Sequence, residues 1–286
     1  MIAFATIAFA GLAFGVVLFL MASGLSVTMG LMGFANLAHA AFAMFGAYLV
    51  VTLMNAHGWP FFATLPVAFV ATALVATVFE RVLFRRLYRS SQLEQVMLTI
   101  GLVFMATAGA VFFFGGDPQA VNVPAWLSGD LQAGGAEINR YRLFLVIFGA
   151  LLIVALILGI EHTTFGAKLR AAVDDRRATA SCGINVDRLF MTAFFLGSGL
   201  AGLGGALSIP IVGLDPNFGL TFLASILIVV TLGGLGSLRG TLAAALVLGI
   251  ADAVGKYYVP WAGAFIIYAV TVALLLWRPQ GLLATR

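Results

Sequence analysis

The charged side chains of this sequence are gathered into a few short stretches of an otherwise apolar chain. No side chain before Glu80 carries a formal charge, and the largest cluster lies between Glu161 and Arg188, with long hydrophobic runs on both sides. Only 9% of the residues are charged and 62% are hydrophobic, whereas soluble domains carry about 25% charged residues. Because an ionised side chain at the centre of a bilayer costs about 3 kcal/mol, this distribution excludes a soluble globule. It predicts a multi-span membrane protein with one polar segment, 161–188, exposed on one face.

Nine apolar runs are the candidate membrane spans. A spanning helix needs about 20 apolar residues, so a chain of 286 residues with short loops has room for roughly eight to ten of them. None of the runs alternates with a period of two, which favours helices over the strands of a membrane barrel. The predicted fold is therefore an all-α, polytopic membrane protein, with one transmembrane domain over 1–286. The runs cover residues 2–28, 33–54, 60–80, 95–115, 142–160, 189–210, 219–235, 241–256 and 261–277.

The basic residues predict how these spans are oriented. If the N-terminus lies outside and nine spans follow, twelve of the 15 lysines and arginines face the cytoplasm, which is the bias that cytoplasmic loops show. The same orientation puts the C-terminus in the cytoplasm and makes 116–141 the largest outside loop, where a soluble partner could bind. The twelve are Arg81, Arg85, Arg86, Arg89, Lys168, Arg170, Arg176, Arg177, Arg188, Arg239, Arg278 and Arg286, and Arg140, Arg142 and Lys256 lie outside.

Within the charged cluster, the residues from Ala167 to Ala178 predict a short cytoplasmic helix. They are rich in alanine and in long side chains, which are good helix formers. Arg170 and Asp174 have the i,i+4 spacing of a stabilising pair. The small side chains leave room for a close partner, although a solvated loop that merely joins two spans fits the composition equally well.

Two polar residues interrupt the second run. Asn36 and His39 are three residues apart and would share one face of a helix. Polar groups at membrane depth face protein or a cavity, so these two either line a pathway or join helices by hydrogen bonds. No second His, Cys or acidic residue accompanies His39 at metal-ligand spacing, so no metal site is predicted. Asp252 and Lys256, at i and i+4, predict an internal ion pair, with a proton relay as the alternative.

The glycine-rich stretch 197–202 matches the dinucleotide-binding pattern G-x-G-x-x-G, but it lies inside an apolar run with no strand before it. The fourth-residue spacing of Gly197, Ala201 and Gly205 instead predicts tight helix packing, and Gly11–Gly15 and Gly236–Gly240 repeat it. The sequence has no G-x-x-x-x-G-K-[ST], which excludes nucleotide hydrolysis by the P-loop route. It has no HExxH or Ser/His/Asp arrangement either.

Four short elements of the sequence form a pattern. They are Gly33–His39 with Met44, Gly46, Ala47 and Tyr48; Gly166 through Arg170–Ala171 and Asp174–Asp175 to Gly183–Asn185; Leu232–Ser237 with Gly240; and Arg278–Leu282. In this order they resemble the elements of one family, the membrane permeases of branched-chain amino acid ABC importers. Family members often have Gly and an acidic residue after the histidine of the first element, where this chain has Ala40 and Ala41, so any role of a carboxylate there is lost.

The resemblance implies a permease of ABC importer architecture in the bacterial inner membrane, which forms half of a pore for branched-chain or other hydrophobic amino acids. It implies a second permease or a second copy, a periplasmic binding protein and two ATPase subunits. These subunits grip the cytoplasmic coupling helix and bind the ATP, so the permease needs no cofactor of its own. The implied coupling residues are Gly166, Arg170, Ala171, Asp174, Asp175, Ala178 and Gly183, and the candidate pathway residues are Asn36, His39, Phe34, Phe42 and Met44.

Several alternatives stay open. Relatives of this kind also carry urea, short amides or small carboxylates. Outside the family, the chain would be a stand-alone channel or an ion-coupled carrier, which needs no ATPase and should show more charged residues within its spans. An intramembrane enzyme is the third class, for which only His39 and Asp252 are candidate catalytic residues.

Overall fold

The computed structural model of the chain describes residues 2–32, 34, 36–88, 90–133, 136–278 and 281–283. Some residues on which the predictions rest lie outside these ranges. They are Gly33 and Ala35 of the first family element, Arg89 and Arg286 of the basic set, and Pro279 and Gln280 of the tail element.

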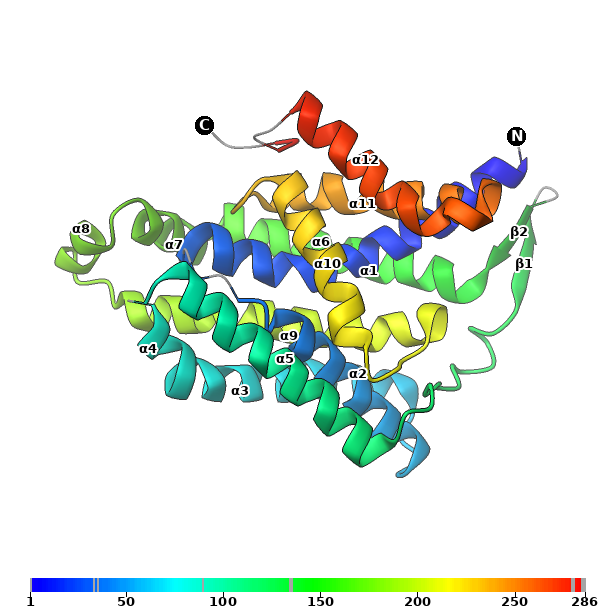
Figure 1. The fold of residues 1–286 in the computed structure, drawn as a ribbon, viewed down its shortest axis with the longest axis horizontal. Helices are drawn as coiled ribbons and strands as arrows, with labels where there is room; N and C mark the ends of the chain where they lie inside the picture. Colours follow the sequence, from blue (N-terminus) through cyan, green and yellow to red (C-terminus); the bar gives the residue numbers. More distant parts are fainter. Residues whose placement is uncertain are drawn as a thin grey trace.

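Nine apolar helices make up the body of the described part of the chain, one for each predicted run (Figure 1). Six are long and apolar enough to cross a membrane, and α2, α10 and α12 are shorter. The prediction of an all-α, polytopic membrane protein is therefore confirmed, while the number of helices that cross a bilayer stays a prediction. The nine are α1 (Ile2–Met32), α2 (His39–Asn55), α3 (Phe61–Phe79), α5 (Gln92–Phe114), α6 (Arg140–Glu161), α9 (Val186–Val212), α10 (Phe218–Gly233), α11 (Leu238–Tyr258) and α12 (Gly263–Trp277).

Helix α9 runs through the bundle and packs against α1, α2 and α3. Its contacts with α1 and α2 are backbone to backbone. A Cβ added at Gly24 of α1 would lie 2.3 Å from the carbonyl oxygen of Gly197, and one at Gly46 of α2 would lie 2.4 Å from that of Gly202. Gly205 meets the backbone of α2 in the same way. The predicted small-residue packing is confirmed, and stretch 197–202 lies within a helix rather than after a strand.

The two other glycine pairs also allow close approach. A Cβ at Gly15 of α1 would lie 2.8 Å from the carbonyl oxygen of Ala245 in α11, so these two helices touch through their backbones. Gly236 has a φ of +82°, which favours glycine, and follows the end of α10 at Gly233. A Cβ at Gly240 would lie 1.8 Å from the carbonyl oxygen of Gly233. The absence of a side chain at Gly240 therefore allows the tight turn between α10 and α11.

The two ends of the bundle carry different short elements (Figure 1). At the left end lie α7 (Thr164–Asp174) and α8 (Arg176–Ser181), together with the π-helical turn η1 (Glu80–Phe84) and α4 (Arg85–Leu87). At the right end lie the N-terminus and the strands β1 (Asp130–Ala133) and β2 (Ala136–Asn139). A 3₁₀ turn, η2 (Pro260–Ala262), precedes α12.

The sequence predicts that segment 116–141 is a loop, but part of it is ordered, because β1 and β2 pair as an antiparallel hairpin. Asp130 lies opposite Asn139, whose side-chain amide donates to the Asp130 carboxylate at 3.1 Å. Earlier in the segment, Gln119 and Leu214 exchange backbone hydrogen bonds of 2.7 and 3.1 Å. These bonds tie the segment to the connection between α9 and α10.

The prediction that the third helix ends near residue 80 is wrong. Its axis continues through η1 and α4 to Leu87, and the whole stretch 61–87 is one of the six long apolar helices. Arg81, Arg85 and Arg86 therefore lie on a continued helix instead of in a loop.

Candidate functional site

Helix α7 starts from a close turn after α6. Thr163 caps it, since its hydroxyl oxygen accepts a hydrogen bond of 3.4 Å from the N–H of Gly166. Gly166 is buried against the last turn of α6, where an added Cβ would lie 1.7 Å from the carbonyl oxygen of Ile160. Only glycine fits at this position without moving α7 away from α6.

One face of α7 anchors it to the bundle. Leu169 and Ala172 are buried, and they share an apolar cluster with Val27 of α1, Leu189 of α9 and Leu238 of α11. The opposite face is exposed, so α7 is amphipathic and presents a row of small and charged residues outward. All the predicted coupling residues except Gly166 are exposed: Arg170, Ala171, Asp174, Asp175, Ala178 and Gly183.

The prediction of one helix from Ala167 to Ala178 is wrong, because the segment is two helices that meet at Asp175. This residue is extended, with φ −148° and ψ 102°. Its carboxylate accepts hydrogen bonds from the N–H groups of Arg177 and Ala178, at 2.8 and 2.9 Å, and so caps α8. An aspartate side chain competes with helix continuation in this way.

Arg170 differs from its predicted contact. Its guanidinium Nη1 donates to the carbonyl oxygen of Ile160 at 2.8 Å, whereas the sequence predicts a pair with Asp174. The last carbonyls of a helix have no partner inside it, and a basic side chain near that end can supply one. Arg170 therefore fastens α7 to the end of α6, and Asp174 stays exposed.

The second run predicts that Asn36 and His39 share one face of a helix. This prediction is wrong, because α2 begins only at His39. Asn36 lies in the connection between α1 and α2, where its carbonyl oxygen accepts a hydrogen bond of 3.3 Å from the His39 N–H. Both side chains are fully buried. The two residues are linked by a backbone turn and not by a helix.

The polar atoms of these two side chains are incompletely satisfied. His39 Nε2 lies 3.0 Å from the carbonyl oxygen of Met21 in α1, so Nε2 must carry the hydrogen and Nδ1 is the acceptor of the neutral ring. Within the described residues, that Nδ1 and both side-chain atoms of Asn36 have no hydrogen-bond partner. A buried polar group without a partner costs about 1–3 kcal/mol.

The three apolar pathway candidates are buried in two different places. Phe34 and Phe42 belong to an aromatic cluster with Phe84 and Phe194, in which the Phe34 and Phe84 ring centroids are 5.3 Å apart. Met44 belongs to the main core of the bundle. The five candidates therefore do not line one surface in this chain.

Asp252 and Lys256 form the ion pair that the sequence predicts, but only its carboxylate is internal, since the Lys256 side chain is 59% exposed. The Lys256 Nζ lies 2.7 Å from the Asp252 carboxylate, which is nearly buried. The ammonium also lies 5.7 Å from the ring centroid of Phe14 in α1. The charge of Asp252 is thus balanced within the helix that carries it.

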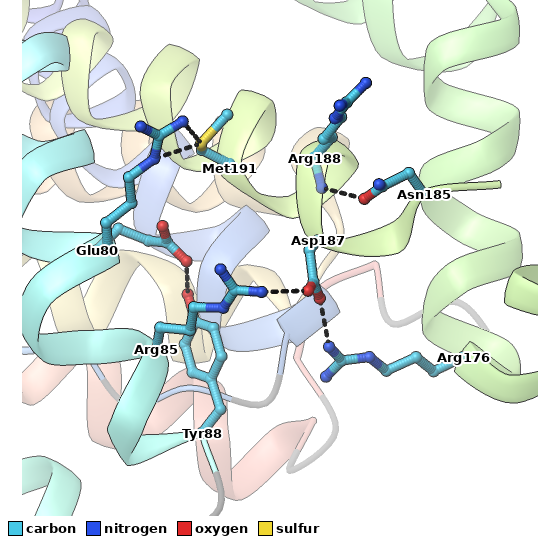
Figure 2. A network of polar contacts seen from close by, with 9 residues as sticks. Glu80, Arg85, Tyr88, Arg176, Asn185, Asp187, Arg188 and Met191 are labelled. Atoms are coloured by element: carbon cyan, nitrogen blue, oxygen red, sulfur yellow. Dashed lines mark hydrogen bonds and ion pairs between the residues drawn. The ribbon is translucent and has the colours of Figure 1, made fainter.

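A pocket of about 900 Å³ at the α7–α8 end was not predicted from the sequence (Figure 2). It opens between the continued helix of η1 and α4 on one side and the start of α9 on the other. We call it the basic pocket, because its lining contains five arginines and only two carboxylates. The arginines are Arg81, Arg85, Arg86, Arg176 and Arg188, and the carboxylates are Glu80 and Asp187.

Asp187 is the centre of the contacts in the basic pocket (Figure 2). Its two carboxylate oxygens hold Arg85 Nη2 at 2.5 Å and Arg176 Nη2 at 2.7 Å, so it joins α4 to α8. The Tyr88 hydroxyl donates to Glu80 at 3.1 Å. Burial and the adjacent Glu80 carboxylate raise the pKa of Tyr88 above its usual range, so the phenol keeps its proton and remains the donor.

The apolar helices form a bundle, and the polar short elements and the charges lie at its two ends. This arrangement defines a multi-pass membrane protein. The particular family follows from comparison with known proteins. The chain belongs to the family of permease components of branched-chain amino acid transport systems, whose model matches residues 7–275. The family that the four sequence elements resemble is thereby confirmed.

Individual relatives match over almost the whole chain. The high-affinity branched-chain amino acid transport system permease protein LivH of Escherichia coli K12 is 27% identical over 292 residues, which cover 96% of this chain and 94% of LivH. BraD of Pseudomonas aeruginosa, with the same description, is 28% identical and covers 96% and 93%. LivM of Escherichia coli K12, a second permease protein of that description, is 26% identical and covers 91% and 66%. No solved structure matches the chain significantly.

Proposed function

We propose that this chain forms half of the pore of an ATP-driven importer in the bacterial inner membrane. The whole chain, 1–286, is one permease domain, and a second permease or a second copy supplies the other half. ATP is bound by two separate ATPase subunits, so the permease has no cofactor of its own. Membership of the permease family supports this proposal, and the similarity to both LivH and LivM supports a pairing of two related permeases.

The geometry of α7 is the observation that carries the proposal. A helix that transmits force from an ATPase needs one face fixed to the bundle and another free to bind. Leu169 and Ala172 fix α7 to α1, α9 and α11, and the close turn at Gly166 and the Arg170 hydrogen bond fix its start to α6. The exposed face then inserts into a groove of an ATPase subunit, with Ala171 at the contact.

Replacing Ala171 by Trp tests this docking. The bulky side chain on the exposed face should block co-purification of the ATPase subunits or abolish the uptake that ATP hydrolysis drives. Leu151→Trp is the matched control, because Leu151 is an exposed residue of α6 outside the α7–α8 segment, and it should leave assembly intact. Normal uptake by Ala171→Trp would reject the docking site. Uptake without any ATPase would instead assign a channel or an ion-coupled carrier.

The proposed orientation puts the α7–α8 end in the cytoplasm, and with it the C-terminus, while the N-terminus and the hairpin end face outside. Arg86 and Arg176 line the same pocket, and Asp130 lies at the opposite end (Figure 1). Single cysteines at these three positions, in a Cys182→Ala background, can be labelled with an impermeant thiol reagent on intact cells. Only the cysteine at position 130 should react. Labelling at position 176 would invert the orientation and remove the docking proposal.

Asn36 and His39 are proposed as the polar groups of the substrate pathway. Their support is the unpartnered amide of Asn36 and the free Nδ1 of His39, which a substrate, a water molecule or the partner permease would satisfy. Asn36 lies in a non-helical connection, so this connection can open without breaking helix hydrogen bonds. Phe34 and Phe42 of the aromatic cluster and Met44 of the main core are the proposed apolar groups of the pathway, and all three are buried in this chain. A pathway must release what it admits, so weak contacts of this kind suit transport.

The substrates are proposed to be branched-chain or other hydrophobic amino acids. The similarity to LivH and BraD, which are permease proteins of branched-chain amino acid transport systems, supports this choice, as does the apolar character of most of the pathway candidates. The test is uptake of labelled leucine by cells that express the chain with the genes adjacent to it. Unlabelled valine and isoleucine should compete, whereas urea, short amides and small carboxylates should not. Competition by urea alone would move the chain to another substrate class.

A further inference from the structure

The basic pocket contains more positive charge than this chain neutralises. Asp187 holds Arg85 and Arg176, while Glu80 accepts from Tyr88. Five arginines against two carboxylates leave three positive charges unbalanced in the lining.

The remaining arginines have poor partners or none. Arg81 donates from Nε and Nη2 to the sulfur of Met191, at 3.3 Å each, and a thioether is a weak acceptor for a charged donor. Within the described part of the chain, the side chains of Arg86 and Arg188 make no hydrogen bond or ion pair. Guanidinium groups without a partner are suited to bind the oxygens of a phosphate.

The position of the pocket favours a lipid over a soluble anion. Val78 and Val82 lie on the same continued helix as Arg81 and Arg85, and these valines are 59% and 54% exposed. In a membrane protein, exposed apolar side chains of a long helix meet acyl chains. Exposed valines and arginines share this stretch of the helix, which therefore marks the level at which hydrocarbon gives way to headgroups.

We propose that the basic pocket binds the phosphate headgroup of an anionic phospholipid in the leaflet at the α7–α8 end. The phosphate contacts Arg86 and Arg188, the two guanidinium groups that the protein leaves without partners, and the acyl chains lie along Val78 and Val82. Because Arg176 of α8 lines the same pocket as Arg81 and Arg86 of the continued helix, a bound headgroup would hold α8 against the bundle. The inference rests on the membrane class of the protein and not on import, so either can fail without the other.

Lipid binding to the purified protein in detergent tests the proposal. The probes are dioctanoyl phosphatidylglycerol, which is anionic, and dioctanoyl phosphatidylcholine, which has no net charge, with bound lipid counted by native mass spectrometry. The first should bind saturably and the second should not. Arg86→Gln combined with Arg188→Gln should weaken phosphatidylglycerol binding about tenfold or more, since basic residues near an anionic lipid each contribute appreciably. Arg177→Gln is the matched control, because Arg177 is an exposed arginine of α8 outside the pocket lining.

Each other outcome overturns the proposal. Equal losses in the double variant and in Arg177→Gln would show only general attraction of basic residues. Displacement of the lipid by inorganic phosphate at equal concentration would make the pocket a site for a soluble anion. Unchanged lipid binding with loss of the ATPase subunits would assign it to an acidic segment of an ATPase. If the double variant does not fold, Arg86→Gln and Arg188→Gln are measured singly, with about a fivefold loss expected for each.

Discussion

The contact between Gly24 and Gly197 predicts a large effect of a single methyl group on the stability of this protein. In Gly24→Ala, the new Cβ would lie 2.3, 2.5 and 2.6 Å from the carbonyl oxygen, carbonyl carbon and Cα of Gly197. Ordinary contacts begin at 3.4 Å, so α1 and α9 must separate by roughly 1 Å. All three atoms belong to the backbone, so no side chain can turn away. Overpacking costs about 1–3 kcal/mol, and the upper end is expected here.

The matched control is Gly109→Ala in α5, where an added Cβ has no neighbour within 4 Å. Alanine replaces glycine in a helix with a gain of about 0.5–1 kcal/mol, so this variant should be as stable as the original protein or slightly more so. Because both glycines are helical, the alanine gain is common to both variants, and they should differ by the overpacking cost alone, roughly 3 kcal/mol. Unfolding of the purified protein in mixed micelles, with rising SDS, measures the difference. Equal stability of the two variants would refute the argument from backbone contact.

Three further predictions concern the candidate sites. His39→Ala removes the hydrogen bond to α1 and should strongly reduce uptake while the ATPase subunits still co-purify, whereas loss of folded protein would assign His39 a purely structural role. Asp187→Asn frees the two arginines that this carboxylate holds, and it should change the free energy of unfolding by less than about 1 kcal/mol because those ion pairs are exposed; a larger loss would show that the pocket contacts stabilise the fold. Gly166→Ala puts a methyl group 1.7 Å from the Ile160 carbonyl oxygen and should displace α7, so that ATP hydrolysis no longer drives uptake, and normal transport would contradict this role.

The positions of the long helices could be predicted from the sequence because a bilayer imposes a simple requirement on each of them. A run of apolar residues of the right length must be helical to satisfy its own backbone. All nine predicted runs correspond to helices, and the small-residue spacing around Gly197 correctly predicts close packing. The ion pair of Asp252 with Lys256 was predictable for a similar reason, since both residues lie on one helix at neighbouring positions.

Two local features were missed although the sequence carries a signal for each. Asp175 divides the charged segment because aspartate is a strong N-cap, and two consecutive acidic residues before Arg176 are a possible helix start. Between the two strands of the hairpin, the sequence has Gly134-Gly135, a dipeptide typical of two-residue hairpin turns. In both places the overall composition of the segment indicates a single helix or a loop, whereas the individual residues, Asp175 and Gly134-Gly135, indicate a helix start and a hairpin turn.

The basic pocket could not be predicted, because it joins residues that are about a hundred positions apart in the chain. Arg85 and Asp187 meet only because η1 and α4 extend α3 and because α9 starts beside them. The sequence predicts that the arginines near Arg85 and those near Asp187 lie on the cytoplasmic side, but location on the same side does not by itself bring them into contact. Asn36 was misplaced for a related reason, since the start of α2 depends on how the connection packs between helices.

The backbone contacts of α9 and α1 bear on how motion can pass through this protein. Interdigitated side chains can change rotamer and let helices slide, but touching peptide groups have no such freedom. Helices α1, α2, α9 and α11 are joined by contacts of this second kind, whereas a Cβ at Gly149 of α6 would meet only the Val16 side chain. Because α7 rests on α1 and α9, a displacement at α7 is expected to reach the hairpin end undiminished. The four helices should therefore move together as one rigid unit, with little sliding between them.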